Sequence, residues 1–142
     1  MKLFIIPALL VALNSYCNAQ SMLLSALTEY TVAGPQYGVS MMYESKKQLG
    51  AGVFYQMDVN LPLETKTKNT FYGGQFQIPI AKAEKLSFYA TLRCGLVNDT
   101  FVVVVPGVET SIKAGKRLRI GFGMSLRMNY PSVSGKLSWK LF

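Results

Sequence analysis

Residues 118–130 alternate strictly between two kinds of side chain, and this pattern constrains the fold more than any other feature of the chain. The apolar members are Leu118, Ile120, Phe122, Met124, Leu126, Met128 and Tyr130, and the residues between them are small or polar. A period of two predicts a β-strand with one apolar face and one polar face. Strands of soluble proteins usually run to about 5–6 residues, whereas a tilted strand that crosses a bilayer needs about 9–11. The length therefore favours a membrane.

The first 19 residues have the composition of a secretory signal peptide. Met1-Lys2 forms a short basic start, residues 3–13 are apolar apart from Pro7, and a polar segment leads to Ala19. This order predicts export and cleavage, and the apolar run is too short for a membrane-spanning helix, which needs about 20 residues. We expect residues 1–19 to be a signal peptide and residues 20–142 to form the β-barrel domain described below.

The chain has two cysteines, and neither predicts a disulfide. Cys17 allows a lipoprotein interpretation, but the bulky Tyr16 before it does not suit a lipidation site. Cys94 is the only cysteine after the signal peptide, so we expect no internal disulfide.

The same alternation, read together with turn residues, predicts eight strands in the exported part. Their ranges are 22–32, 36–44, 49–59, 70–80, 86–96, 100–113, 118–130 and 133–142. Two of them leave alternatives open. The range 22–32 also suits a short helix over residues 22–27. Pro106-Gly107 interrupts the sixth strand as either a bulge or a turn, and we favour the bulge because a turn leaves two strands too short to span.

Eight alternating strands predict an all-β fold, an up-and-down antiparallel β-barrel that is transmembrane and has both ends of the chain on the same side. The apolar face is expected to meet lipid, since a barrel of this size has an interior filled by side chains. Nine charged residues then point inward: Glu29, Glu44, Asp58, Arg93, Glu109, Arg119, Arg127, Lys136 and Lys140. Buried charges persist when they are paired, so the sequence predicts a network inside the barrel, with Glu44, Asp58, Arg93, Glu109, Arg119 and Arg127 as its candidates.

The signal peptide, the strands rich in glycine and aromatic residues, and the last strand at 133–142 resemble the small eight-stranded outer-membrane β-barrel proteins of Gram-negative bacteria, the OmpA/OmpX-like group. The resemblance implies an outer-membrane location and insertion by the outer-membrane assembly machinery, which reads a terminal aromatic residue such as Phe142. In this chain Leu137, Trp139 and Leu141 alternate, so Phe142 is out of phase with the apolar face. Functions in this group range from adhesion to lipid-modifying catalysis, so the fold alone selects none of them.

Basic residues exceed acidic ones, 15 to 7. Many lie in short segments between the expected strands, where they serve solubility or contact anionic lipid and lipopolysaccharide. Nucleic acid is not expected as a partner, because the basic residues form no single stripe along the chain. The longest loop, residues 60–69, is the candidate surface loop and carries Glu64, Lys66 and Lys68.

The chain contains no histidine, so a catalytic site that relies on a histidine proton relay is excluded. We expect no catalytic residues, no metal and no cofactor. The predicted function is a non-enzymatic outer-membrane protein with an envelope-structural, anchoring or surface-interaction role. The alternative is a soluble secreted β-sandwich or a lipocalin-like binding protein.

The signal-peptide pattern predicts that the mature protein begins at Gln20. The intact mass of the protein isolated from its native host should equal that of residues 20–142. A mass that retains residues 3–13, or that carries lipid on Cys17, would contradict this cleavage site.

Overall fold

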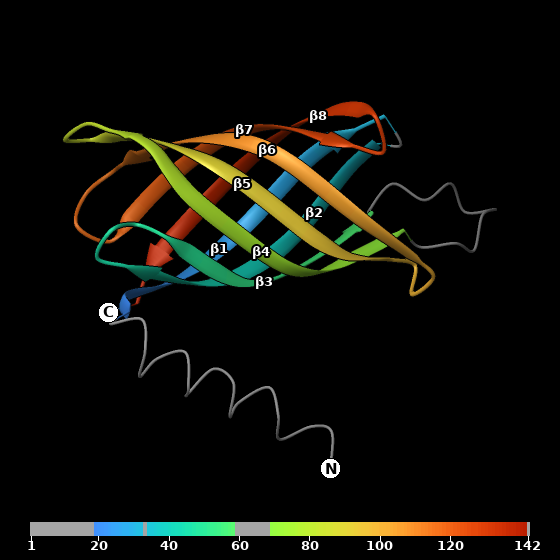
Figure 1. Cartoon of the computed structure of the whole chain (residues 1–142), viewed down its shortest axis with the longest axis horizontal. Coiled ribbons are helices and arrows are strands. Elements are labelled where there is room, and N and C mark those ends of the chain that lie inside the picture. The colour runs from blue at the N-terminus through green and yellow to red at the C-terminus, as the bar shows by residue number, and fades with distance from the viewer. Residues whose placement is uncertain (1–18, 33, 59–68, 142) are drawn as a thin grey trace, which may run out of the picture.

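The structure, a computed structural model, describes residues 19–32, 34–58 and 69–141, and it is a closed barrel of eight antiparallel strands (Figure 1). The strands are β1 (Ala19–Thr31), β2 (Gly34–Ser45), β3 (Gly50–Asp58), β4 (Thr70–Lys82), β5 (Leu86–Val97), β6 (Phe101–Lys113), β7 (Leu118–Arg127) and β8 (Tyr130–Lys140). Each strand pairs with its neighbours in sequence, and β1 pairs with β8. The predicted all-β, up-and-down barrel is confirmed, and the closed single sheet excludes a two-sheet sandwich.

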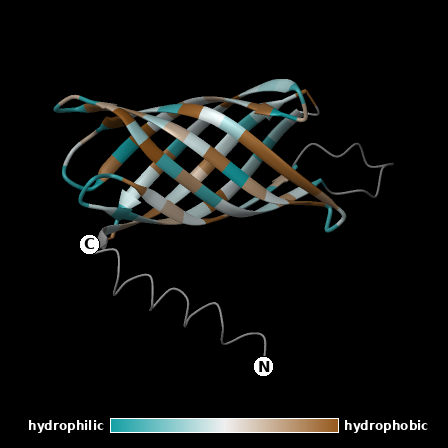
Figure 2. Cartoon of the chain, in the orientation of Figure 1, coloured by the Kyte–Doolittle hydropathy of each residue, from teal (hydrophilic) through white to brown (hydrophobic). Residues whose placement is uncertain are grey.

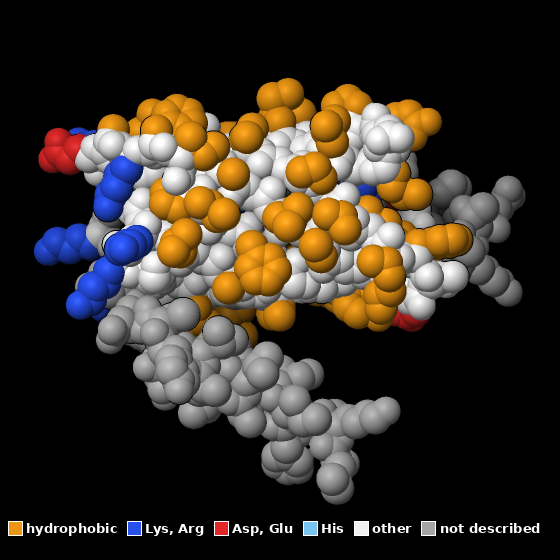
Figure 3. All heavy atoms as spheres, viewed as in Figure 1, with side chains coloured by type: hydrophobic (Ala, Val, Ile, Leu, Met, Phe, Trp, Pro, Cys, Tyr) orange, Lys and Arg blue, Asp and Glu red, His pale blue; other side chains and the backbone are white. Residues whose placement is uncertain are grey.

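The two faces of the wall differ sharply in polarity. Large apolar side chains are exposed on the outside along every strand, which gives the alternating colours of Figure 2 and the scattered apolar spheres of Figure 3. Among the described residues, 15 polar or charged side chains are buried but only 7 apolar ones. A soluble barrel that binds an apolar ligand has an apolar interior and a polar outer face. The polarity of this barrel therefore argues against the lipocalin-like alternative. It is the polarity of a transmembrane barrel.

Exposed aromatic side chains are most frequent near one end of the outer face. Around the end opposite the chain termini, six of them face outward: Tyr30, Tyr37, Tyr55, Tyr72, Phe101 and Tyr130. The rings of Tyr55 and Tyr72 stack with centroids 6.3 Å apart. Phe88 and Trp139 are exposed near the end that carries the termini. A belt of aromatic rings at the edge of an apolar band is characteristic of proteins embedded in a bilayer.

The first strand is a strand throughout, so the helical alternative for residues 22–27 is wrong. It runs from Ala19 to Thr31 and pairs with β2 and β8. None of the described residues belongs to a helix long and apolar enough to cross a membrane. The rest of the predicted signal peptide, residues 1–18, lies outside the described residues, as does Phe142.

The favoured bulge at Pro106-Gly107 is wrong, and so is the turn. The β5–β6 ladder continues through Leu92↔Pro106 and Thr91↔Gly107 without a shift of register. Pro106 is tolerated because the β6–β7 ladder begins only at Gly107, so no hydrogen bond to β7 requires the N–H that proline lacks. A register shift does occur near another strand proline, between Pro79 and Ala81 in the β4–β5 ladder.

The turn between β7 and β8 also differs from the prediction, which placed it at Pro131-Ser132. β7 ends at Arg127, and the turn consists of Met128 and Asn129 with positive φ angles of 51° and 68°. Two left-handed residues are typical of the type I′ turns that match the twist of a hairpin. Met128 continues the apolar alternation, so hydropathy did not reveal where the strand ends.

Two paired glycines lie where neighbouring strands approach each other closely. Gly73 of β4 and Gly95 of β5 are partners in the ladder. A Cβ atom at Gly73 would meet the carbonyl oxygen of Cys94, and one at Gly95 would meet that of Tyr72. The absence of a side chain at both residues therefore permits the close approach of β4 and β5.

Met124 tests the assignment of the outer face, because it is 60% exposed and lies between Val108 and Val133 on adjacent strands. Met124→Arg is expected to lower the free energy of unfolding in vesicles by about 2–4 kcal/mol, the cost of a charge near the bilayer midplane. Met124→Leu is the matched control and should have little effect. Equal stability of the two variants in a denaturant titration would show that residue 124 does not face lipid.

Candidate functional site: the polar interior of the barrel

The interior of the barrel is the only place where the described residues bring charged groups of both signs into contact. Its polar side chains come from every strand because each strand turns alternate residues inward. Three ion pairs form there, Glu29–Arg93, Glu44–Arg119 and Glu109–Lys136. Each of them joins strands that are not neighbours in the sheet, so the pairs bridge the interior rather than lie along the wall.

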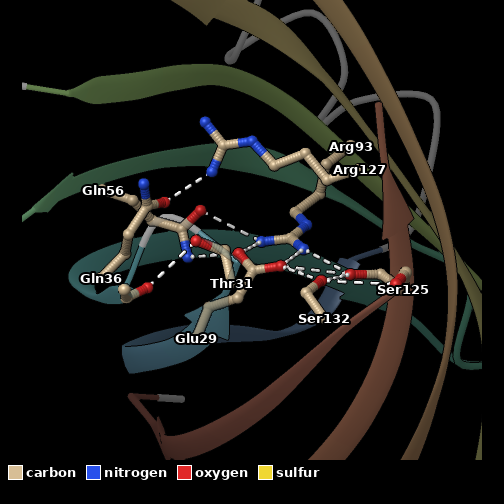
Figure 4. A network of polar contacts seen from close by, with 9 residues as sticks. Glu29, Thr31, Gln36, Gln56, Arg93, Ser125, Arg127 and Ser132 are labelled. Carbon is tan, nitrogen blue, oxygen red and sulfur yellow. Dashed lines mark hydrogen bonds and ion pairs between the residues drawn. The ribbon is translucent and has the colours of Figure 1, made fainter. Parts of the chain in front are cut away.

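Glu29 of β1 is at the centre of the largest cluster (Figure 4). Arg93 of β5 binds it through both guanidinium nitrogens, with Nη1 2.9 Å from Oε2 and Nη2 2.8 Å from Oε1. Gln56 of β3 donates to Oε2 at 3.1 Å. Ser125 of β7 and Ser132 of β8 donate to Oε1 at 3.1 and 2.7 Å. The carboxylate is fully buried, and its hydrogen bonds compensate for the loss of water.

Arg93 itself is well satisfied in this cluster. Its Nη1 also donates to Oε1 of Gln56 at 3.1 Å, and its Nη2 donates to the hydroxyl of Ser125 at 3.1 Å. The guanidinium lies 5.8 Å from the ring centroid of Phe54, within the range of a cation–π contact. The planar group therefore fills the middle of the barrel as well as neutralising Glu29.

A second pair lies nearer the end that carries the termini. Arg119 of β7 donates to both carboxylate oxygens of Glu44 on β2, at 2.6 and 2.8 Å. Gln77 of β4 adds a hydrogen bond to the same carboxylate at 3.3 Å. This fork-to-carboxylate geometry is the strongest arrangement for such a pair.

The third pair joins β6 and β8, with Lys136 Nζ 2.7 Å from Glu109 Oε2. A cavity of about 40 Å³ lies beside it, lined in part by Gln75, Arg93, Ser134 and Lys136. The side-chain nitrogen of Gln75 is buried without a protein partner. A polar cavity of this size accommodates ordered water, which would supply that partner.

The interior becomes apolar toward the end opposite the termini. Phe54, Phe71, Val103 and Val105 form a buried cluster there, and the rings of Phe54 and Phe71 meet edge to face at 4.7 Å. Arg127 lies over the ring of Phe71, 4.4 Å from its centroid, and donates to Oε1 of Gln36 at 2.6 Å.

The candidates named from the sequence do not all take part in ion pairs. The structure places Glu44, Arg93, Glu109 and Arg119 in the three pairs. Arg127 pairs with an amide, and Asp58 is buried with its Oδ1 atom unpartnered. The surface-loop candidates Glu64, Lys66 and Lys68 lie outside the described residues.

Sequence reasoning placed Glu29 and Lys136 among the inward charges but did not single them out, although each belongs to an ion pair. It missed the roles of Ser125 and Ser132 altogether. For Glu29, the sequence feature that could have indicated an ion pair was its inward position on the first strand. The two serines carried none, since small polar residues occur throughout the inner face.

The arrangement holds charges in place rather than exposing them to a substrate. The carboxylates of Glu29 and Glu44 are covered by bases and amides, and both are buried. Among the described residues, no group of three or more His, Cys, Asp or Glu side chains is placed to hold a metal ion.

Comparison with known proteins identifies the fold. No protein-family model and no curated protein matches the sequence. Among solved structures, the chain is similar to the de novo designed TMB2.3, with 11% identity, a TM-score of 0.64 and coverage of 86% of this chain and 94% of that chain. It is also similar to a structure from the de novo design of transmembrane beta-barrels, with 12% identity, a TM-score of 0.65 and coverage of 87% and 97%.

The crystal structure of Neisserial surface protein A gives a TM-score of 0.46 at 12% identity, with coverage of 84% of this chain and 93% of that chain. The likeness to the two designed proteins shows that this chain has the fold of a transmembrane β-barrel.

The Glu29–Arg93 pair predicts a large effect of a single neutralisation. Glu29→Gln leaves the buried guanidinium of Arg93 without its counter-charge and should lower the free energy of unfolding by about 3–5 kcal/mol. The double variant Glu29→Gln with Arg93→Met removes both charges and should lose less than the sum of the two single variants. Denaturant titration of the barrel in detergent or vesicles measures these differences.

Glu84→Gln is the matched control, because Glu84 is exposed on the hairpin between β4 and β5 and belongs to none of the three ion pairs. Its effect should stay within about 0.5 kcal/mol. If Glu29→Gln were as mild as Glu84→Gln, the cluster around Glu29 would not contribute to stability.

Proposed function

We propose that this chain is an outer-membrane β-barrel protein that is exported through its signal peptide and serves the cell envelope without catalysis, as a structural, anchoring or surface-interaction protein. The observation that carries the proposal is the inverted polarity of the barrel, apolar outside and ion-paired inside. In lipid every backbone polar group needs a partner within the protein, and a closed sheet provides one for each strand edge.

The outer membrane is proposed because the two lines of support converge on it. The sequence begins with a signal-peptide pattern, so the chain is expected to leave the cytoplasm. Single-chain barrels of even strand number, with short turns at the end that carries the termini, are typical of bacterial outer membranes. In that orientation both termini face the periplasm, and the tyrosine-rich belt lies at the outer surface.

The absence of catalysis is proposed on chemical grounds. The full sequence lacks histidine, and the interior carboxylates of Glu29 and Glu44 are engaged by arginines at 2.6–2.9 Å. Carboxylates that are buried and paired in this way are not exposed to a substrate.

The proposed partners follow from the location. The outer face suits membrane lipid, lipopolysaccharide is the proposed partner at the outer surface, and the outer-membrane assembly machinery is the proposed route of insertion. Lys66 and Lys68, which lie in the sequence between β3 and β4, are the proposed contacts to lipopolysaccharide phosphates.

Fractionation with gel analysis tests the proposal. The protein should sediment with outer membranes, and its unheated and heated forms should migrate differently, because a folded barrel resists detergent. A chain that appears in the soluble periplasmic fraction, with a single band before and after heating, would refute a membrane role.

Protease treatment of whole cells tests the orientation. Trypsin should cleave after Lys66 or Lys68 and spare Lys82 and Lys116, which lie on hairpins at the end that carries the termini. In lysed cells all four should become susceptible. Cleavage of intact cells at Lys82 or Lys116 alone would mean that the barrel is inserted the other way round.

A further inference from the structure

Exposed basic side chains gather at one end of the barrel, the end that carries the termini (Figure 3). They lie on the three hairpins that join β2 to β3, β4 to β5 and β6 to β7, and we call them the terminal rim: Lys46, Lys47, Lys82, Lys85, Lys116 and Arg117. Among the described residues at this end, Glu84 is the exposed acid. Six bases against one acid give the exposed groups of the rim a net charge of +5.

The other end of the described barrel has no comparable charge. Its exposed charged residue is Asp99, which accepts a hydrogen bond from the hydroxyl of Tyr72 at 2.6 Å. Arg127 is turned into the interior, where it binds Gln36. Among the described residues, exposed positive charge is therefore concentrated on the rim that carries the termini.

The ladder holds some of the bases next to one another. The backbone N–H of Lys140 donates to the carbonyl of Arg117 at 2.7 Å, and the N–H of Lys113 donates to the carbonyl of Lys85 at 2.9 Å. Like charges on adjacent strands repel. None of these four residues belongs to the three ion pairs of the described barrel, all of which lie inside it. Lys140 shares the inward phase of Leu23, its buried partner on β1, whereas Lys116 and Arg117 are exposed together on one hairpin. An external anion between these two exposed residues would relieve their repulsion.

The rim also lies where the membrane surface would meet the barrel. Trp139 is 49% exposed, pairs with Leu118 beside Arg117, and precedes Lys140. Phe88 is exposed on β5, close to the hairpin that carries Lys85. Since exposed aromatic rings prefer the headgroup level of a bilayer, the neighbouring bases would lie at the level of the lipid phosphates.

We propose that the terminal rim is a binding surface for anionic phospholipid headgroups, with Lys116 and Arg117 together contacting one lipid phosphate. This proposal rests on the membrane role proposed above and names the lipid class that the barrel prefers at this end. A lipid is favoured over a soluble polyanion because the bases continue directly from the apolar belt. The guanidinium of Arg117 supplies paired donors for the phosphate, and the ammonium of Lys116 adds a second charge.

Trp139 provides the test, because it is the only tryptophan of the chain. The purified protein is inserted into vesicles of unlabelled phosphatidylcholine that contain one brominated lipid. This lipid is either brominated phosphatidylglycerol or brominated phosphatidylcholine, with bromine near the headgroup end of the acyl chains in both. Quenching of Trp139 fluorescence by each brominated lipid gives their relative binding beside this residue. One base near an anionic surface is worth a factor of about five, so at low salt phosphatidylglycerol should bind several-fold more tightly.

In the double variant Lys116→Gln with Arg117→Gln, the ratio of the two binding affinities should fall close to one. The matched control, Lys46→Gln with Lys47→Gln, removes the same charge from a hairpin two strands away and should keep most of the preference. Measurement of the wild-type protein in 1 M salt, where screening acts over about 3 Å, should also abolish the preference and does not depend on any variant folding.

The outcomes separate the two proposals. Equal quenching by both lipids in the wild-type protein, or a preference unchanged in the Lys116 and Arg117 variant, overturns the lipid preference while the membrane role stands. If neither brominated lipid quenches Trp139, the residue is not at a bilayer, and the proposed membrane role fails with it. A preference that is lost in this variant, retained in the control and abolished by salt supports the proposal.

Discussion

The carboxylate of Glu29 is fully buried on β1 and receives hydrogen bonds from side chains of four other strands, β3, β5, β7 and β8. A charge in this environment is tolerated only while its partners stay in place. A slip of one residue in any of these strands would turn its contributing side chain toward lipid. The buried charge of Glu29 keeps its partners only if these strands hold their register. The backbone hydrogen bonds of the wall do not impose this requirement, since they can also form in a shifted register.

Most of the fold could be predicted from the period-two pattern, which gave eight strands and the face of nearly every residue. The pattern was not sufficient where the polarity of a residue does not indicate its face of the sheet or its backbone conformation. Val102 to Val105 are identical in sequence, yet Val103 and Val105 are buried and Val102 and Val104 are exposed. Met128 keeps the apolar phase but lies in a turn, because its left-handed backbone conformation leaves no trace in its polarity.

The interior site was predictable as a set of inward charges but not as a set of pairs. Glu44 lies on β2 and its partner Arg119 on β7, and they are 75 residues apart. Which inward residues of distant strands reach the same level depends on the tilt and stagger of the closed sheet. Alternation along a single strand specifies neither quantity. The same reason explains why Ser125 and Ser132 could not be distinguished from the other inward serines.

The ladder between β1 and β8 has a consequence for how the protein is made. It joins strands at the two ends of the barrel sequence, as in the hydrogen bond between Ser25 and Ser138, which are 113 residues apart. Before β8 arrives, the outer edge of β1 has no partner, and lipid offers none. Insertion one hairpin at a time from the first strand would therefore leave polar edges in the hydrocarbon. Entry into the bilayer must wait for the last strand, and until then both open edges can pair with other chains, so a delay in synthesis or transport favours aggregation.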